Sequence, residues 1–188
     1  MNRLDEILAD NKAFVEKKAY ERFRTTRFPD RKIIIFSCMD TRLTHLLPEA
    51  LGLQNGDAKF IKNAAAIVTH PFGSIMRSII VAIYELKAEE VFVIGHHGCG
   101  MSSIDPQKVI ESMRMEGISD ETLQTLKYSG IDLNSRLHGF DCVFESVRES
   151  VGKIRNHPLL TKKIAVHGLI IDPETGLLEV VVNGYQDR

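Results

Sequence analysis

Two short stretches of this sequence combine cysteine, histidine, aspartate and arginine at spacings suited to metal chemistry. The first is Cys38-Met39-Asp40-Thr41-Arg42, and the second is Gly95-His96-His97-Gly98-Cys99-Gly100. Cys38, His96 and Cys99 would together offer two thiolates and one imidazole, a ligand set that suits Zn²⁺. Three protein ligands leave a fourth tetrahedral position for water, which is typical of a catalytic zinc site rather than a closed structural one. We therefore predict one zinc ion per chain, held by these three side chains.

Each motif directly follows an apolar run of the length of a buried β-strand. Residues 33–37 precede the first motif, and residues 91–94 precede the second. Continuous apolar runs are typical of parallel strands, whose carboxyl ends share one edge of a sheet, so both motifs are expected at that edge. The glycines around His96 permit tight turns. Cys99 is expected at the start of the next helix, where the helix dipole favours a thiolate.

The rest of the chain alternates between helix-like and strand-like patterns. Apolar residues at helical spacing predict helices over residues 4–23, 72–86, 103–116, 119–128 and 139–156. Strand-like runs occupy residues 32–37, 59–63, 90–95, 163–171 and 177–182. The predicted fold class is α/β: a mostly parallel β-sheet flanked by helices, with an antiparallel C-terminal edge hairpin and an N-terminal helical arm. We expect a single domain over residues 1–188, with the arm over residues 1–28.

Each motif has a simpler explanation when it is taken alone. The first could be a cysteine at a strand end beside a salt bridge, and the spacing H-x-x-C is by itself a weak metal signal. A structural zinc site also stays open, because Asp40 could supply a fourth ligand. The pattern G-x-x-G-x-G is not a dinucleotide fingerprint. A cysteine phosphatase loop is excluded because it needs its arginine six positions after the cysteine, whereas Arg42 lies four after Cys38.

The composition limits the classes of partner. Of the 188 residues, 44% are hydrophobic and 26% are charged, and the formal net charge is −1 at pH 7. We therefore expect no nucleic-acid partner, and no membrane partner because no apolar run reaches the roughly 20 residues of a membrane span. The three cysteines are not spaced like a disulfide framework, and acidic residues stand where a signal peptide would need an apolar stretch, so we expect a cytoplasmic protein. Cys142 is predicted to be a buried residue of helix 139–156.

The paired motifs resemble those of the β-carbonic anhydrases. In that family a C-x-D-[ST]-R motif supplies one zinc-binding cysteine, and a later G-H-x-x-C-G motif supplies the histidine and the second cysteine. The similarity includes residues 57–65 and 166–172, covers nearly the whole chain and is closest to the short, archaeal-like branch. Lys62 and Ala65 stand where the family often has arginine and glycine, and His97 replaces a small hydroxyl residue.

The resemblance implies a carbonate dehydratase, a zinc lyase that reversibly hydrates carbon dioxide to bicarbonate and a proton. Zinc-bound hydroxide would be the nucleophile, because zinc lowers the pKa of bound water. Asp40 would orient this hydroxide, and Arg42 would hold Asp40 ionised through a bidentate ion pair. His97 and His70 are candidates for carrying the proton away, since imidazole titrates near neutral pH.

Two other functions stay open on the sequence alone. Hydrolysis of carbonyl sulfide or carbon disulfide would use the same zinc chemistry on a similar linear molecule. A zinc-bearing regulatory protein without turnover would result if Asp40 filled the fourth position permanently. The β-carbonic anhydrases also form dimers or larger assemblies in which the N-terminal helix packs on a neighbour. The resemblance thus implies a homodimer or homotetramer, with carbon dioxide and bicarbonate as the small-molecule partners.

Overall fold

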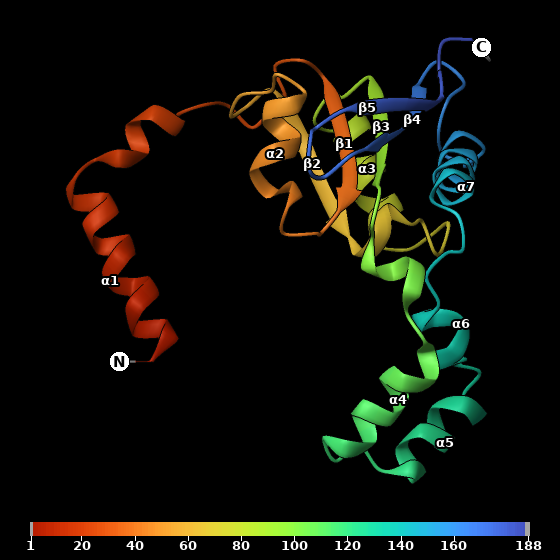
Figure 1. Ribbon diagram of the computed structural model, residues 1–188. Helices are drawn as coiled ribbons and strands as arrows, with labels where there is room; N and C mark the ends of the chain where they lie inside the picture. The colour runs from red at the N-terminus through yellow and green to blue at the C-terminus, as the bar shows by residue number, and fades with distance from the viewer. Residues whose placement is uncertain (1, 187–188) are drawn as a thin grey trace.

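The computed structural model describes residues 2–186, and its centre is a five-stranded β-sheet in the order β2-β1-β3-β4-β5 (Figure 1). The strands are β1 (Ile33–Cys38), β2 (Ala58–Asn63), β3 (Glu90–His96), β4 (Ala165–Ile171) and β5 (Leu178–Val182). The strands β1 to β4 pair in parallel, and β5 is antiparallel to β4. This architecture confirms the predicted α/β fold with an antiparallel C-terminal edge.

Seven α-helices and three short 3₁₀ segments lie within residues 2–186. The α-helices are α1 (Arg3–Glu16), α2 (Leu43–Ala50), α3 (Ser74–Tyr84), α4 (Pro106–Met115), α5 (Asp120–Tyr128), α6 (Leu133–Leu137) and α7 (Val143–Arg155). The 3₁₀ segments are Ala19–Phe23, Ala64–Ala66 and Gly100–Ser103. No helix in this part of the chain is both long and apolar enough to cross a membrane.

Successive residues of the central strands feed two hydrophobic clusters, one on each face of the sheet, because side chains alternate along a strand. Ile34 and Phe36 of β1 belong to the first cluster, and Ile35 belongs to the second. Helices α3 and α7 contribute residues to the first cluster, and α2 contributes to the second. Coverage of both faces explains why the run before Cys38 is continuously apolar.

Helix α7 packs closely on β3 and β4 because a glycine faces it from each strand. A Cβ atom on Gly95 would lie 2.8 Å from Val147 Cγ2, and one on Gly168 would lie 2.7 Å from Val147 Cγ1. Both distances are too short for carbon atoms, so the observed packing requires glycine. Gly95 of β3 therefore allows the close packing of α7. Gly98, with a φ of +60°, supplies the turn between His96 and Cys99.

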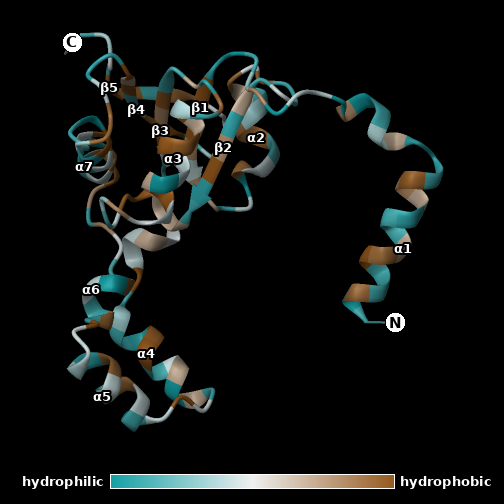
Figure 2. Ribbon diagram, turned by 180° about the vertical axis from the view of Figure 1, so that it is seen from behind, coloured by the Kyte–Doolittle hydropathy of each residue, from teal (hydrophilic) through white to brown (hydrophobic). Residues whose placement is uncertain are grey.

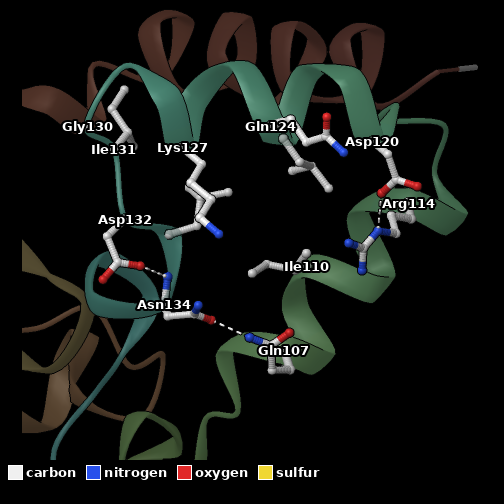
Figure 3. A pocket seen from close by; sticks show the side chains of 12 residues that line it. Gln107, Ile110, Arg114, Asp120, Gln124, Lys127, Gly130, Ile131, Asp132 and Asn134 are labelled. Atoms are coloured by element: carbon white, nitrogen blue, oxygen red, sulfur yellow. Dashed lines mark hydrogen bonds and ion pairs between the residues drawn. The ribbon is translucent and has the colours of Figure 1, made fainter.

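Two helical parts of the chain extend away from the sheet (Figures 1 and 2). Helix α1 contains no buried residue, and its apolar side chains Leu4, Ile7 and Leu8 are each more than half exposed. Helices α4, α5 and α6 form the second projection and line a cavity of about 420 Å³ (Figure 3). This cavity has no cysteine or histidine in its lining, so the metal chemistry predicted above belongs elsewhere.

Three details of the predicted elements are wrong. The helix predicted over residues 4–23 ends at Glu16, because Lys18 adopts a left-handed conformation with a φ of 51°. The helix predicted over residues 139–156 begins only at Val143, so Cys142 is its N-terminal cap and is exposed rather than buried. Helices α2 and α6 have no predicted counterpart, since α2 contains Pro48 and α6 has only five residues.

Candidate metal centre

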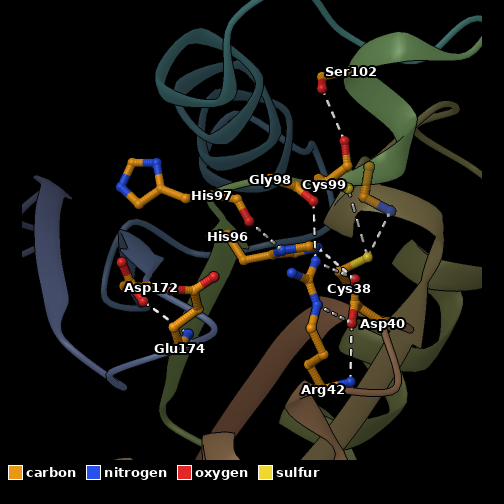
Figure 4. A network of polar contacts seen from close by, with 11 residues as sticks. Cys38, Asp40, Arg42, His96, His97, Gly98, Cys99, Ser102, Asp172 and Glu174 are labelled. Atoms are coloured by element: carbon orange, nitrogen blue, oxygen red, sulfur yellow. Dashed lines mark hydrogen bonds and ion pairs between the residues drawn. The ribbon is translucent and has the colours of Figure 1, made fainter.

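The two sequence motifs meet at the carboxyl ends of β1 and β3, which are neighbouring parallel strands. Cys38 ends β1, His96 ends β3, and Cys99 follows in the next loop. All three side chains are buried, and their ligand atoms lie within 4.8 Å of one another (Figure 4). The two Sγ atoms are 3.9 Å apart. The structure thus brings the three predicted metal ligands together.

The imidazole of His96 is oriented so that one ring nitrogen is left for a metal. Nδ1 lies 2.9 Å from the carbonyl oxygen of His97, and a carbonyl only accepts, so Nδ1 carries the proton. Nε2 then presents a lone pair. It is buried and has no hydrogen-bond partner within residues 2–186. A buried nitrogen of this kind is costly, and coordination to a metal ion would satisfy it.

The distances and the donor types fit zinc. In a tetrahedral site with Zn–S bonds of about 2.3 Å, two sulfur ligands lie roughly 3.8 Å apart. The 3.9 Å between the Sγ atoms of Cys38 and Cys99 agrees with that value. Two thiolates and one imidazole also form a known catalytic ligand set, in which the fourth position holds water. Cys38, His96 and Cys99 can therefore hold the metal that the sequence predicts.

The two thiols differ in how readily they ionise. Burial raises the pKa of Cys38, but the neighbouring His96 imidazole and hydrogen bonds from the amides of Asp40 and Ala65 together outweigh burial and lower it to about 7. Burial raises the pKa of Cys99 to about 11, and the negative charge of Cys38 acts in the same direction. Cys38 is thus the readier thiolate near neutral pH, and Cys99 would release its proton on metal binding.

Asp40 and Arg42 form a bidentate ion pair beside the three candidate ligands. Arg42 Nε donates to Asp40 Oδ1 at 3.0 Å, and Nη2 donates to Oδ2 at 2.8 Å. These hydrogen bonds lower the pKa of Asp40 to about 2, against the smaller opposing effect of burial. Arg42 Nη2 also donates to the carbonyl oxygen of Gly98 at 3.0 Å, which ties the first motif to the second. Asp40 Oδ2 lies 3.7 Å from His96 Nε2, so the carboxylate faces the metal position.

A pocket of about 440 Å³ adjoins the two cysteines. The Asp40–Arg42 pair forms part of its lining, and its apolar walls come from Met39, Ala64 and Met101. A small apolar molecule that enters this pocket would meet the metal position on the side of the Asp40 carboxylate.

The two histidines considered for proton transfer lie in different surroundings. His97 is partly exposed beside the metal motif, and its Nε2 lies 2.7 Å from Glu179 Oε1 on β5. His70 is exposed in the loop before α3, where its Nδ1 accepts a hydrogen bond from the Phe72 amide. Proton transfer by either histidine stays a prediction.

Two backbone groups that the motifs did not reveal also belong to the site. The Ala65 amide donates to Cys38 Sγ at 3.3 Å, and the Gly98 carbonyl accepts from Arg42. Both depend on left-handed backbone, with φ values of +67° at Ala65 and +60° at Gly98. The one sign in the sequence was that Ala65 stands where the resembled family often has glycine. Cys99 precedes a 3₁₀ segment and not, as expected, an α-helix, since α4 begins only at Pro106.

Comparison with known proteins identifies the family. The sequence model of a family described as carbonic anhydrase matches residues 33–178 of this chain, and this range includes both motifs. The chain belongs to the carbonic anhydrase family. The structure of β-carbonic anhydrase isoform I from Trichomonas vaginalis has a TM-score of 0.88 and 34% sequence identity, covering 98% of this chain and 100% of that chain. This similarity confirms the β class that the motifs predicted.

Two curated relatives show the range of the carbonic anhydrase family around this chain. YvdA of Bacillus subtilis, which carries the name of carbonic anhydrase provisionally, is 57% identical over 99% of this chain and 94% of its own length. A protein named carbon disulfide hydrolase from Acidithiobacillus thiooxidans is 29% identical over 79% of this chain and 76% of its own length. The relatives of this chain are therefore named for two different activities.

Proposed function

We propose that this chain is a zinc enzyme that reversibly hydrates carbon dioxide to bicarbonate and a proton. The observation that carries the proposal is the convergence of the Cys38, His96 and Cys99 ligand atoms beside an apolar pocket, in a chain of the carbonic anhydrase family. A protein named β-carbonic anhydrase 1 in Mycobacterium tuberculosis is 29% identical over 81% of this chain, which supports the same activity.

In this reaction the three metal ligands, Asp40 and Arg42 would have separate roles. Zinc bound by the three side chains would lower the pKa of a water molecule and so supply a nucleophile. Asp40 is ionised at neutral pH, and its Oδ2 would accept the hydrogen bond of that nucleophile. This contact would turn a lone pair of the nucleophilic oxygen toward carbon dioxide in the pocket. Arg42 positions Asp40 through the bidentate pair and through the Gly98 carbonyl.

The pocket walls favour an apolar substrate. Carbon dioxide carries no charge, and Met39, Ala64 and Met101 offer it carbon and thioether surface rather than side-chain hydrogen bonds. Asp40, Thr41 and Arg42 supply polar side chains to the lining, beside which the charged product would form.

Metal reconstitution tests the proposed activity. The full-length chain is stripped with a chelator and supplied with one equivalent of Zn²⁺, and carbon dioxide hydration is followed by stopped flow with a pH indicator. Zinc should restore activity in the native chain and in Cys142→Ser, whose altered residue is exposed, but not in Cys99→Ser. A zinc-loaded native chain that does not hydrate carbon dioxide would refute the proposal.

Carbon disulfide or carbonyl sulfide is the second candidate substrate, because a relative 29% identical to this chain is named carbon disulfide hydrolase. The same zinc-loaded protein is assayed for sulfide release from either compound. A kcat/KM higher than that for carbon dioxide would assign the chain to this second activity. Full zinc occupancy without turnover of any of these substrates would instead support a regulatory zinc protein.

We also propose that residues 1–188 form one domain whose arm, residues 1–28, packs on a second copy in a homodimer or homotetramer. Helix α1 has no buried residue, although Leu4, Ile7 and Leu8 are apolar, and a partner surface would cover them. Sordaria macrospora proteins of the same fold are described as tetrameric β-carbonic anhydrases. Sedimentation of the full chain should show an assembly that is lost without residues 1–28, and a monomeric full chain would contradict this.

The free cysteines support a cytoplasmic location.

A further inference from the structure

Two consecutive alanines next to the metal centre adopt a backbone conformation that alanine rarely takes. Ala65 has φ and ψ angles of 67° and 5°, and Ala66 has a φ of 58°. In this left-handed region the Cβ of an L-residue crowds its own backbone, so each of the two residues is strained. Strained non-glycine residues cluster at functional sites, and an observed outlier is therefore a reason to look for what it achieves.

The surrounding structure holds this strained turn from both sides. Ala65 and Ala66 are 5% and 1% exposed, and their methyl groups belong to different hydrophobic clusters on the two faces of the sheet. Asn63 Nδ2 donates to the carbonyl oxygen of Ile67 at 2.8 Å and so closes the turn across its ends. The Val68 amide donates to the Ser150 hydroxyl of α7 at 3.2 Å. The Asn63 and Val68 hydrogen bonds thus fix the turn through contacts that do not involve the metal ligands.

The strained conformation directs one backbone group at a ligand atom. The Ala65 amide donates to Cys38 Sγ at 3.3 Å in a buried position. We propose that the left-handed turn makes Ala65 a positioning residue, whose amide orients the Cys38 sulfur and limits the electron density that this sulfur donates to the metal. This inference rests on the proposed metal site but not on the identity of the substrate.

The physical effect follows from the charge of a thiolate. A hydrogen bond to sulfur stabilises its lone pairs, because the partial positive charge of the N–H lies against them. The stabilised lone pairs give less charge to a bound metal ion, and groups that contact a ligand in this way tune the metal. Loss of the Ala65 N–H should therefore raise the energy of the Cys38 lone pairs and leave the ligand count unchanged.

Cobalt(II) makes this effect visible without an activity assay. The full-length chain is loaded with Co²⁺, and its sulfur-to-cobalt charge-transfer band is recorded. Lactic acid at position 65, in place of alanine, replaces the amide N–H by an ester oxygen and keeps the methyl group. We expect the band to move to longer wavelength, because higher lone pairs on sulfur need less energy to transfer charge.

The Val68 amide offers a matched control, because it donates a buried hydrogen bond in the same turn to Ser150 rather than to sulfur. The corresponding hydroxy acid at position 68 should lower stability and leave the band in place. The variant Ala65→Gly keeps the N–H and adopts a positive φ without strain, so it should fold and also show the native band.

Three results would overturn the proposal. They are an unmoved band in the position 65 ester, an equal movement in the position 68 ester, and an equal movement in Ala65→Gly. Loss of cobalt binding by the position 65 ester would contradict it as well, because the ligand count is expected to stay unchanged. A failure of this proposal can be distinguished from a failure of the proposed function. If the native chain binds cobalt and shows a thiolate band but hydrates no carbon dioxide, its band can still be compared with that of the position 65 ester.

Discussion

Replacement of Arg42 by alanine separates orientation of the nucleophile from binding of the metal. The Arg42 side chain donates to both carboxylate oxygens of Asp40, at 3.0 and 2.8 Å, and to the Gly98 carbonyl at 3.0 Å. Arg42→Ala removes these three hydrogen bonds and leaves all three candidate metal ligands in place. It also leaves the Arg42 amide, which donates to Asp40 Oδ1 at 2.9 Å. Asp40 should therefore stay near the metal position but lose its fixed orientation.

The lowered pKa of Asp40 gives an upper limit for the effect, because Asp40 stays ionised at neutral pH and loses only its fixed orientation. This pKa is lowered from 3.8 to about 2, and at about 1.4 kcal/mol for each pKa unit the ionised form is favoured by about 2.5 kcal/mol. The amide of residue 42 supplies part of this stabilisation and survives the substitution. The Arg42 side chain is also 44% exposed, so solvent weakens the ion pair. A loss of about 1–1.4 kcal/mol remains, and kcat/KM for carbon dioxide should fall roughly five- to tenfold.

Arg31 provides a closely matched control. Its Nε lies 3.2 Å from Asp57 Oδ2, and its Nη2 donates to the Gly52 carbonyl at 2.7 Å. The Arg31 and Asp57 side chains are 52% and 17% exposed, against 44% and 18% for the Arg42 and Asp40 side chains. Arg31 and Asp57 precede β1 and β2, however, and so lie at the opposite end of the sheet from the metal centre.

Stopped-flow hydration assays with parallel zinc analysis compare the two variants. Both should contain one zinc per chain, Arg42→Ala should show the reduced kcat/KM, and Arg31→Ala should match the native chain. A kcat/KM for Arg42→Ala within twofold of the native value at full zinc occupancy would refute the orienting role of the pair. Equal losses in the two variants would refute it as well, because they would trace the effect to general stability.

Three further predictions concern the ligands, the packing and the ion pair. Cys99→Ser should lose most of its zinc in elemental analysis, whereas Cys142→Ser should keep it; equal zinc contents would count against Cys99 as a ligand. Gly95→Ala should lower the free energy of unfolding by about 1–3 kcal/mol in urea, because its Cβ would lie 2.8 Å from Val147 Cγ2, and an unchanged midpoint would show that α7 moves freely. Because the folded pKa of Asp40 is lowered to about 2, its ion pair stabilises the fold above the ordinary carboxyl pKa of about 3.9 and ceases to do so as the pH falls through 2. In metal-free protein, the stability difference between the native chain and Arg42→Ala should thus be constant above about pH 5 and shrink below it, and a constant difference down to pH 2 would be inconsistent with the lowered pKa.

The place of the metal centre could be predicted because it depends on strand direction and short spacing. The apolar runs before Cys38 and before the His96 motif indicate buried parallel strands, and parallel strands bring their carboxyl ends to one edge. Gly98 lies between His96 and Cys99, and its positive φ lets the chain turn back within three residues. Both features can be recognised in the sequence without knowledge of the packing around them.

Features that arise from packing could not be predicted in the same way. The left-handed conformation of Ala65 is imposed by its neighbours, since alanine itself prefers negative φ values. Apolar residues at helical spacing extend back to Phe140, so the sequence predicted that Cys142 lies inside the helix. The helix begins only at Val143 and Cys142 is exposed, because apolar spacing does not show where a helix begins. Helix α2 was not predicted because it contains Pro48, and proline normally indicates the end of a helix.

X-ray absorption at the zinc edge of the purified full-length chain tests the central claim most directly. We expect one zinc per chain with two sulfur ligands at about 2.3 Å and nitrogen or oxygen ligands at about 2.0–2.2 Å. The Cys99→Ser protein, loaded with excess zinc, should show one sulfur ligand instead of two. A native chain that binds no zinc, or one whose zinc has a number of sulfur ligands other than two, would contradict the metal centre of Cys38, His96 and Cys99.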